Sequence, residues 1–480
     1  MKHLSRKITC TLLLTSMLLS MQACGGEAVS SDTTTAPAGD TTTAEPEYQL
    51  PEADFGGETF NVYLWSLSKL PVEEENGDIL NDAIYARNRA VEDLYNFKFS
   101  YTLSDGAGAY DTWITTLNAS VMAGDDSVQL AGGYGYRLTA QTLDGSWANL
   151  LEIPEIDFTQ EWWLQNLQEA GNLGGAMYFI FGNIDADFYN NLYTIYFNKK
   201  MAESYSLPDL YDMVRDGKWT LDKLIEFTSV AGSDLNGDSQ MIDEEDQFGY
   251  MTDVFMGIDA FITASDITFT QDAADQTPEL LPLSDKYVAL SDKLTRFLVN
   301  NENVSLFSTG ESVLPAFNEG RLMFMGNTLA CSATMRDKDT DFGIIPYPKW
   351  DETQENYGSF LAVDNVTTYI IPITADASKA GTILNALAYY GYNDVLPIYY
   401  EKSLKGKGIR DDESGEMLDI IFDNIRFDFT QIYNISFGID RSPFHLLRYC
   451  VANDTGMASR WESMASIHAS TMEKLIATLK

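Results

Sequence analysis

The sequence predicts an α/β protein whose folded part is divided into two lobes. Strand-like runs alternate with helical runs between residues 59 and 131, and this alternation is typical of a largely parallel sheet covered by helices. The chain after residue 54 is about 430 residues long, which exceeds the size at which one hydrophobic core keeps growing. Two lobes are therefore the expected organisation.

The elements at the start of the folded part follow one another in a regular order. A strand-like run at Thr59–Trp65 precedes a helical stretch at Ile79–Tyr95, and then come a strand, a helix and a short apolar run at Phe97–Leu103, Asp111–Met122 and Val128–Ala131. Sheets of this kind bind ligands at the loops beyond the carboxyl ends of their strands. The loops at 65–68, 105–111 and 132–137 combine aromatic and polar side chains, two of them with glycine, so we expect ligand contacts there.

Residues 1–23 have the composition of a bacterial export signal. Basic residues at positions 2, 6 and 7 give a positive start, and the apolar run Ile8–Leu19 is too short to span a bilayer comfortably. Ala23 and Cys24 supply the small residue and the thiol of a lipoprotein processing site. We expect a lipid on Cys24 and a location on the extracytoplasmic face of the cell membrane. The alternative is an ordinary cleaved signal in which Cys24 has no role.

Residues 24–54 are expected to form a disordered tether. They are poor in large apolar side chains and repeat a Thr-Thr-Thr-Ala pattern, so burial cannot offset the entropy cost of ordering them. A flexible segment of about 28 residues reaches on the order of 30 Å, which lets the folded part stand away from the membrane.

The mature chain is strongly acidic. Its formal net charge changes from −40 to −43 when the three basic residues of the signal are removed. Such a surface repels nucleic acid, so we expect no nucleic-acid partner. Cys331 and Cys450 remain in the folded part, and two distant cysteines make neither a metal cluster nor a disulfide framework, although a single bridge between them stays open.

Several stretches of the chain carry a resemblance to a known family. They are Leu192–Lys200, Glu203–Pro208, Lys218–Leu224, Gly320–Asn327, Phe342–Pro348 and Ala377–Tyr390. In their order and spacing they resemble the extracellular solute-binding proteins, family 1 type, of carbohydrate ABC importers, and the resemblance covers most of residues 55 to 480.

This resemblance implies a two-lobed periplasmic-binding-protein-like fold, type II-like, with ligand held in a cleft that closes around it. Lobe I would hold residues 55–190 and 350–395, and lobe II would hold residues 191–349 and 396–480. The chain would cross between the lobes near 185–192, 347–351 and 392–396. The implied partners are a sugar or oligosaccharide, two permease subunits and an ATPase, and we expect the binding protein itself to be a monomer.

The chemistry of sugar capture selects candidate site residues independently. A pyranose offers apolar faces and an edge of hydroxyl groups, so its site needs flat aromatic rings and planar polar groups. Each candidate also has a plain packing or surface interpretation, since aromatic rings mostly pack in cores. The candidates are Trp65, Asp105, Tyr134, Tyr136, Arg137, Asp185, Asp187, Asn191, Asn327, Trp350 and Arg441.

One acidic loop predicts a different chemistry. Oxygen-bearing side chains stand at positions one, three, five, seven and twelve of a calcium-loop spacing, namely Asp234, Asn236, Asp238, Gln240 and Glu245. Ser239 replaces the usual glycine at position six, and Ile242 offers no ligand at position nine. The loop is therefore either a structural Ca²⁺ site or a solvated acidic turn, and no other cofactor is required.

The competing class of protein is a lipid-anchored carbohydrate-active enzyme, such as a glycoside hydrolase. Asp185 and Asp187 would then be the acid and base, but two carboxylates on one short segment do not flank a glycosidic bond from opposite sides. No nucleophile-elbow, zinc-protease or phosphate-loop motif is present in the sequence. We therefore expect a binding protein that captures a carbohydrate and carries out no reaction on it.

Overall fold

The computed structural model describes residues 48–105, 110–138, 145–242, 245–273, 276–307, 313–406 and 408–477. The chain divides into two compact units, and the unit from Ala53 onward contains all the elements described below. Within the described residues, no helix is both long enough and apolar enough to span a membrane. Cys24 and the predicted signal segment lie outside the described residues.

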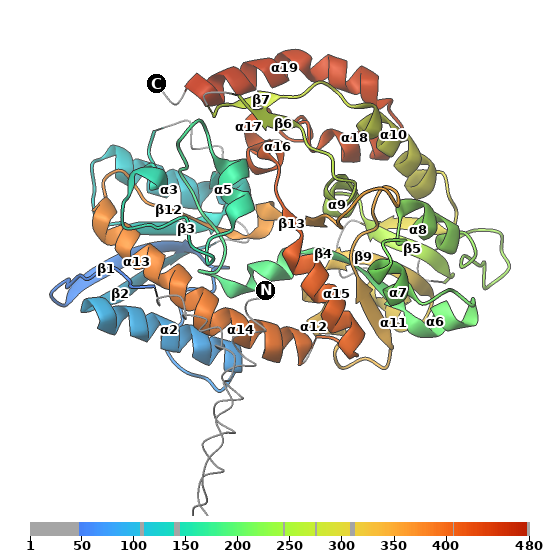
Figure 1. Cartoon of the computed structure of the whole chain (residues 1–480), viewed down its shortest axis with the longest axis horizontal. Coiled ribbons are helices and arrows are strands. Elements are labelled where there is room, and N and C mark those ends of the chain that lie inside the picture. Colours follow the sequence, from blue (N-terminus) through green and yellow to red (C-terminus); the bar gives the residue numbers. More distant parts are fainter. Residues whose placement is uncertain are drawn as a thin grey trace, which may run out of the picture. The chain divides into compact units, whose positions relative to one another are not determined.

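The first lobe is built on a four-stranded sheet with the strand order β12-β3-β1-β2 (Figure 1). Its strands are β1 (Glu58–Trp65), β2 (Phe97–Ser104), β3 (Leu130–Tyr134) and β12 (Thr367–Ile370). β1 pairs in parallel with both β2 and β3, whereas β12 runs antiparallel to β3. The parallel pairing of β1 with its two neighbours confirms the largely parallel sheet that the alternation of strands and helices predicted.

Helices cover both faces of this sheet. The connection from β1 to β2 contains α2 (Ile79–Tyr95), and the connection from β2 to β3 contains α3 (Tyr110–Met122). These two connections step across the sheet in opposite directions, so right-handed crossovers put α2 and α3 on opposite faces, as Figure 1 shows. Asp78 caps the start of α2 by accepting hydrogen bonds from the backbone of Leu80 and Asn81.

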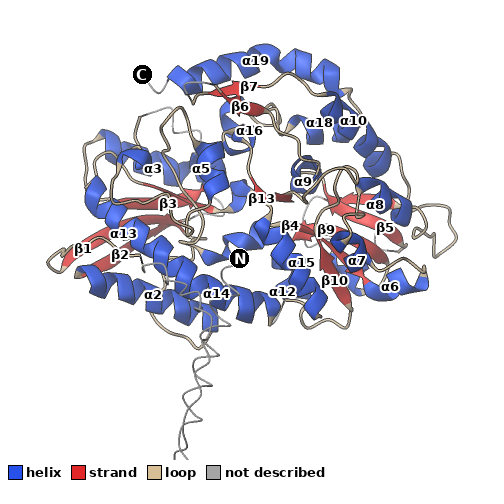
Figure 2. Cartoon of the chain, viewed as in Figure 1, coloured by secondary structure: helices blue, strands red, loops and turns tan. Residues whose placement is uncertain are grey.

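The second lobe is built on a five-stranded sheet with the order β10-β4-β9-β5-β8, which Figure 2 shows in red at the right. β5 (Phe248–Asp253) runs parallel to β8 (Val304–Phe307) and β9 (Leu322–Thr328). β4 (Tyr193–Asn198) runs antiparallel to β9 and to β10 (Phe342–Ile345). Every residue of β4, β5 and β10 is buried, as expected of strands covered on both faces.

Short helices surround the second sheet. They are α6 (Lys199–Ser204), α7 (Leu210–Arg215), α8 (Leu221–Thr228), α9 (Met256–Ala264), α10 (Asp285–Leu294), α11 (Leu314–Asn318) and α12 (Ala330–Met335). Their apolar faces meet the sheet in one continuous core that includes the fully buried Trp219, Tyr250 and Phe261. The indole N–H of Trp219 donates to the Pro346 carbonyl at 2.9 Å, so even this buried ring has its polar atom satisfied.

The chain crosses between the two sheets through segments that pair with each other. The 3-10 turn η3 (Ala186–Asn191) leads from the first lobe into β4, and its neighbour Leu192 bridges Leu361 on the second crossing. That second crossing contains β11 (Ser359–Phe360), which pairs with β13 (Ile425–Arg426) on the way back. The second crossing therefore lies at about 359–366, later than the 347–351 expected from the sequence.

The third expected crossing, near 392–396, is not where the chain leaves the first lobe. Helix α13 (Ala377–Tyr390) continues through wider helical turns at 391–395, through α14 (Leu396–Ile398) and on to Lys405. This continuous helical segment, residues 377–405, packs along α2 of the first lobe. The next helix in the chain, α15 (Asp412–Asp423), packs on β10 of the second lobe. The buried residues Val395, Leu396, Tyr399 and Tyr400 continue the apolar face beyond Gly391, and a boundary drawn from the resemblance alone missed this continuation.

The C-terminal part adds helices that pack on both lobes. α16 (Phe429–Ile432) packs on α5 (Gln165–Gly171) of the first lobe, and α17 (Asn434–Phe437) packs on α4 (Gly135–Leu138). α18 (Leu446–Ala452) packs on α9 and α10 of the second lobe, and α19 (Met457–Ala477) covers α10, α17 and α18. Residues 429–437 therefore lie on the first lobe, although the sequence placed all of 396–480 on the second.

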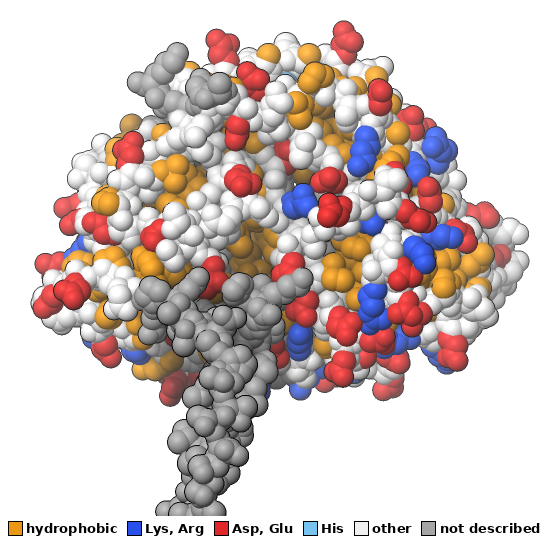
Figure 3. Space-filling model, viewed as in Figure 1, with side chains coloured by type: hydrophobic (Ala, Val, Ile, Leu, Met, Phe, Trp, Pro, Cys, Tyr) orange, Lys and Arg blue, Asp and Glu red, His pale blue; other side chains and the backbone are white. Residues whose placement is uncertain are grey.

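Two smaller features lie outside these layers. A hairpin of β6 (Thr270–Asp272) and β7 (Pro278–Leu280) lies under α19, and a single 3-10 turn, η2, spans Leu150–Glu152. On the face shown in Figure 3, acidic side chains are spread over the whole surface, while lysine and arginine gather mainly over the second lobe.

Candidate functional site

The candidate site lies where elements at the strand ends of the two sheets face each other. β5 of the second lobe ends at Asp253, and its carboxylate accepts hydrogen bonds from the Tyr193 hydroxyl and from the backbone N–H groups of Phe255 and Gly257. This cap starts α9 and leaves the Phe255 ring 49% exposed. Facing α9 is η5 (Val363–Asn365), whose Asn365 amide lies 3.6 Å from the sulfur of Met256.

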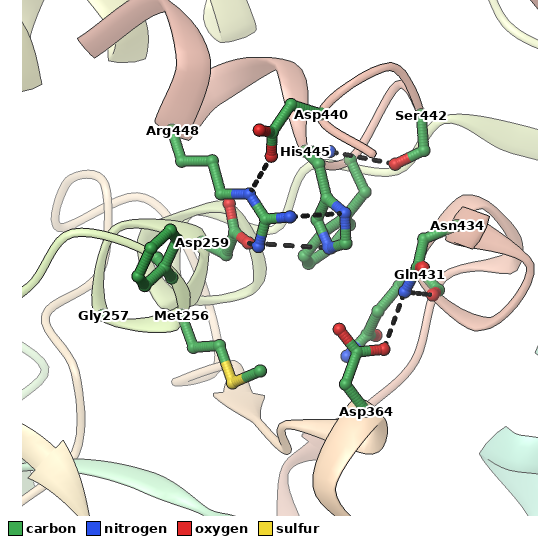
Figure 4. Close-up of polar contacts among 12 residues, drawn as sticks. Met256, Gly257, Asp259, Asp364, Gln431, Asn434, Asp440, Ser442, His445 and Arg448 are labelled. Atoms are coloured by element: carbon green, nitrogen blue, oxygen red, sulfur yellow. Dashed lines mark hydrogen bonds and ion pairs between the residues drawn. The ribbon is translucent and has the colours of Figure 1, made fainter. Parts of the chain in front are cut away.

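The second-lobe wall of the site is an arginine held between two carboxylates (Figure 4). Arg448 on α18 donates from Nε to Asp440 at 2.7 Å and from one terminal nitrogen to Asp259 on α9 at 3.1 Å. Its other terminal nitrogen donates to Nδ1 of His445 at 3.2 Å. Although burial opposes it, the two carboxylates raise the pKa of Arg448, so the guanidinium stays charged.

The neighbours of Arg448 have shifted protonation equilibria. Burial raises the pKa of the Asp259 carboxyl well above its ordinary value, and Arg448 only partly offsets this effect. Burial and the nearby guanidinium lower the pKa of His445 well below its ordinary value, so the imidazole is neutral. Because Nδ1 of His445 accepts from Arg448, its proton sits on Nε2, which is 3.6 Å from Asp259.

The first-lobe wall is a buried carboxylate supported by amides. Asp364 on η5 accepts a hydrogen bond from Nδ2 of Asn434 at 2.8 Å, and the same nitrogen also donates to the Gln431 carbonyl. The Gln431 side chain in turn donates to the Leu361 carbonyl at 2.8 Å. Burial raises the pKa of Asp364 to about 6, against the opposing effects of Asn434 and Arg448.

A glycine brings an aromatic residue up to Asp364. A Cβ on Gly135 would stand 2.6 Å from the Val363 carbonyl oxygen, so only glycine allows α4 to approach η5 this closely. The next residue, Tyr136, is half-buried, and the charges of Asp364, Arg448 and Asp440 all act on its hydroxyl. Tyr136 therefore lies on a helix that packs against η5 and α17, and its hydroxyl is within the electrostatic influence of both walls.

Further aromatic rings back Tyr136. Its ring centroid lies 5.8 Å from that of Tyr134, which stacks on Trp65 at 5.4 Å. Trp65 is almost fully buried and its indole N–H donates to the Thr367 hydroxyl at 3.0 Å. Tyr134 and Tyr136 are thus the members of this stack that remain partly accessible, while the buried Trp65 packs against Tyr134 from the lobe interior.

The remaining candidates of the first lobe have mixed outcomes. Arg137 lies over the Tyr136 ring at 5.6 Å and pairs with Asp111 at 3.3 Å, so it flanks the site. Asp105 is exposed at the end of β2. The side chain of Asp187 lies outside the described residues. Asn191 is half-buried and donates to the Phe188 carbonyl at 3.4 Å.

Asp185 does not face the site, contrary to the sequence expectation. Its carboxylate accepts hydrogen bonds from the hydroxyl groups of Tyr369 at 2.9 Å and Ser68 at 3.3 Å, and it lies near the Arg87 guanidinium. All four side chains are buried in the first lobe. Arg87 also donates to the Ile184 carbonyl, so this cluster anchors the first crossing segment to the lobe rather than offering groups to a ligand.

The second-lobe candidates do not join the site either. Trp350 packs on the second-lobe core with the Lys293 ammonium 4.3 Å above its ring. Asn327 is buried in β9, where its side-chain oxygen accepts from the backbone of Thr328. Arg441 is exposed, and its backbone carbonyl accepts from His468 at 2.8 Å.

Most of the polar residues of the site escaped sequence reasoning. They are Asp259, Asp364, Gln431, Asn434, Asp440 and Arg448, together with the exposed ring of Phe255. Phe255 lies two residues beyond the end of β5, with a glycine two positions further on, so its place just after a strand end made it detectable. Asp364, Asn434 and Arg448 come from three separate segments, and no local pattern marks them.

A second hollow lies beside the site without sharing its residues. It has a volume of about 290 Å³ and lies between α5, the β6–β7 hairpin and β13. Its lining includes Asn166, Asp266, Arg426 and Phe444. We favour the first site because it lies at the carboxyl ends of strands from both sheets, where open α/β sheets bind their ligands.

The acidic loop is held together by hydrogen bonds of its own. The Asp234 carboxylate accepts from the backbone of Gly237 and Ser239, Asn236 accepts from Asp238, and Asp238 accepts from Gln240. Glu245 accepts from the Asn236 amide at 2.6 Å. Among the residues that the structure describes, no group of three or more metal-binding side chains is assembled, but Asp243 and Glu244 are outside that set. Calcium binding therefore stays a prediction.

Comparison with known proteins identifies the fold. No sequence model of a known family and no curated protein matches the chain. Many solved structures match it, among them a sugar transporter from Rhizobium etli in an open conformation, at 13% identity and TM-score 0.55 over 88% of this chain and 98% of that one.

Two further matches have similar coverage. UgpB from Mycobacterium tuberculosis in complex with glycerophosphocholine matches at 14% identity and TM-score 0.54, over 86% of this chain and 98% of that one. An ABC substrate-binding protein from Listeria monocytogenes in complex with cycloalternan matches at 11% identity and TM-score 0.53, over 88% and 99%. The chain therefore has the two-lobed fold of ABC solute-binding proteins, as the sequence resemblance implied.

Proposed function

We propose that the protein is the solute-binding subunit of an ABC importer and captures a sugar or oligosaccharide between its two lobes. The observation that carries the proposal is the site itself, where the partly accessible rings of Tyr136 and Phe255 accompany a set of charged and amide groups from both lobes. Rings of this kind suit the apolar faces of a sugar, and the polar groups suit its hydroxyl groups. The fold shared with sugar-binding proteins of ABC transporters supports the same assignment.

The enzyme alternative has little support. Its proposed acid and base were Asp185 and Asp187, and the Asp185 carboxylate is buried against Tyr369, Ser68 and Arg87. A group buried in the first-lobe core cannot reach a glycosidic oxygen. The cluster at Arg448 offers two carboxylates, but both are bonded to that guanidinium.

The direct test is a screen of the purified protein against a panel of oligosaccharides. A ligand that binds only the folded protein raises the melting temperature, and calorimetry then gives its affinity. A binding protein returns the sugar intact after overnight incubation, whereas a hydrolase shortens it. Cleavage of any sugar in the panel would favour the enzyme, and a panel without a single melting shift would count against sugar capture.

The proposal extends to the membrane and the importer. We propose that Cys24 carries a lipid, that residues 24–54 tether the folded part to the extracytoplasmic face, and that two permease subunits and an ATPase are the partners. The basis is the sequence around Cys24, with its small preceding residue and apolar run.

The anchor is tested by replacing the thiol. The variant Cys24→Ala should leave the membrane fraction or accumulate with an uncleaved signal, because the acylated residue is missing. Fractionation and the change in gel mobility measure this outcome. Cys331→Ala is the matched control and should stay in the membrane fraction. A Cys24→Ala protein that remains membrane-bound with unchanged mobility would contradict lipidation.

A further inference from the structure

The nitrogen atoms of the site are already committed to partners inside the protein. Each of the three guanidinium nitrogens of Arg448 donates to Asp440, Asp259 or His445. On the opposite wall, Nδ2 of Asn434 donates twice, to Asp364 and to the Gln431 carbonyl. These contacts use three of the five N–H groups of Arg448 and both N–H groups of Asn434, so on these two side chains a ligand that presents only acceptors, such as a carboxylate or a phosphate, finds only two N–H groups, on a guanidinium that two carboxylates already neutralise.

Oxygen acceptors remain open at the same place. Among the described residues, the Asn434 Oδ1 and Asp259 Oδ1 atoms are buried without a hydrogen-bond partner. Asn434 Oδ1 is an acceptor at any pH, whereas Asp259 Oδ1 is certain to accept only when the carboxyl is ionised. Asp364 uses one carboxylate oxygen for Asn434, and in Figure 4 its other oxygen points into the space between the two walls. Buried acceptors without partners are costly, so a ligand that brings hydroxyl or amine donors gains by satisfying them.

The charges of the site also disfavour an anionic ligand. Arg448 is balanced by Asp440, His445 is neutral, and Asp364 adds a negative charge at neutral pH. The net charge of these groups is therefore negative, whether Asp259 is protonated or ionised. In a buried site, where screening is weak, this charge repels an anion and attracts a cation.

We propose that the interlobe site selects an uncharged or cationic, hydroxyl-rich ligand and rejects carboxylated and phosphorylated ones. The proposal rests on the proposed function and narrows its substrate class to neutral and amino sugars. Arg448, which is the natural group for binding an anion, is instead neutralised by Asp440 and Asp259 and serves as a structural part of the wall. Asp364 is the residue that sets the sign of the charge.

The first test needs no knowledge of the ligand. The variants Asp440→Asn and Asp364→Asn/Asp440→Asn remove one and two negative charges beside Arg448. Asp440 has a left-handed backbone (φ 53°), which asparagine also tolerates, so its backbone should be preserved. The probe is inorganic phosphate at low concentration, compared with chloride at equal ionic strength, and the readout is the melting temperature of the purified full chain.

Phosphate should leave the wild type unchanged and raise the melting temperature of the double variant by about 2 °C or more, with a smaller rise for Asp440→Asn. Asp454→Asn is the matched control, because Asp454 is an exposed aspartate with a similar left-handed backbone (φ 47°) and it lies just beyond α18. A phosphate response of the wild type equal to that of the double variant would overturn the proposal. So would the absence of any response in both variants.

The second test compares sugars that differ only in charge. Matched trisaccharides with neutral, amino and uronate residues are tested against the wild type by thermal shift and calorimetry. In any series that binds, the neutral or amino member should bind at least tenfold more tightly than the uronate. A uronate or sugar phosphate that binds as tightly as its neutral counterpart overturns the proposal. If no sugar of any charge binds, the proposed function fails, and the phosphate test still decides the selectivity of the site.

Discussion

At the scale of single residues, Asp364 links the stability of the fold to pH. Its carboxyl pKa is raised to about 6 by burial, whereas an aspartate in an unfolded chain titrates near 3.8. Between these two values the native protein holds a proton that the unfolded chain has lost. The contribution of Asp364 to the free energy of unfolding therefore decreases as the pH rises from about 4 to about 6.

The variant Asp364→Asn should remove this dependence. At pH 4 the variant and the wild type should have similar stability, and at pH 7 the variant should be more stable by on the order of 3 kcal/mol. Urea denaturation at pH 4, 5, 6 and 7 measures the difference. Asp454→Asn serves as the control and should differ from the wild type by a constant amount. An Asp364→Asn difference that is the same at pH 4 and pH 7 would contradict the raised pKa.

Two aromatic residues should carry much of the ligand affinity. Phe255 is 49% exposed on the second-lobe wall, and Tyr136 lies near Asp364 on the first-lobe wall. Truncating a ring that stacks on a ligand costs about 2 kcal/mol, or roughly thirtyfold in affinity. Calorimetry on Phe255→Ala and Tyr136→Ala measures the loss. Tyr205→Ala, at an exposed ring on the end of α6, is the control and should bind as the wild type does.

The sequence identified the part of the site that follows strand ends and missed the part that depends on long-range packing. Trp65 and Tyr134 are the last residues of β1 and β3, and Tyr136 lies two positions beyond β3, so the alternating pattern placed them. The contact of Asn434 with Asp364 joins residues 70 positions apart, and that of Arg448 with Asp259 spans 189 positions. Such pairs are set by the packing of whole elements, and no short motif records them.

At the scale of elements, the first crossing segment shows why a local pattern misled. Asp185 and Asp187 alternate on this segment, which favoured an interpretation as a cleft-facing pair. Arg87 from α2 and Tyr369 from β12 reach the same point, and a buried carboxylate is stable only with such partners. No local pattern in the sequence indicates that α2 supplies an arginine there. The pairing of β1 with β2 and β3, by contrast, followed from local periodicity.

The acidic loop carries the prediction of calcium binding. Asp234, Asp238 and Glu245 lie on one short loop at the spacing of a calcium loop, and a bound cation would draw together carboxylates that are not assembled among the described residues. Removing calcium with EDTA should lower the melting temperature, and added calcium should restore it. Asp238→Ala should abolish the response, and Asp272→Ala, on an exposed strand of the β6–β7 hairpin, should preserve it. If EDTA does not change the melting temperature, the calcium prediction is wrong and the loop is a solvated acidic turn.

At the scale of the whole folded unit, the crossings determine how the lobes move. Leu192 bridges Leu361, the Ala362 N–H donates to the Asn191 carbonyl at 3.0 Å, and β11 pairs with β13. These short ladders connect two separate sheets, each with its own core. Motion between the lobes is therefore expected to occur at the crossings, as in the hinge closure of periplasmic binding proteins, whose two-lobed fold this chain shares.

A ligand stabilises the closed arrangement only if it contacts both lobes there. The site meets this condition because Tyr136 lies on α4 of the first lobe and Asp364 on η5, which packs against α4, while Phe255 lies beside the Arg448 cluster of the second lobe. Differential contacts with the two lobes are the source of the free energy that shifts the population toward closure.

The most direct test of capture between the lobes is small-angle X-ray scattering of the purified protein with and without the sugar found by the screen. The radius of gyration should fall when the sugar is added. It should not fall for Phe255→Ala at a sugar concentration that saturates only the wild type. A sugar that binds by calorimetry yet leaves the wild-type radius of gyration unchanged would contradict the account.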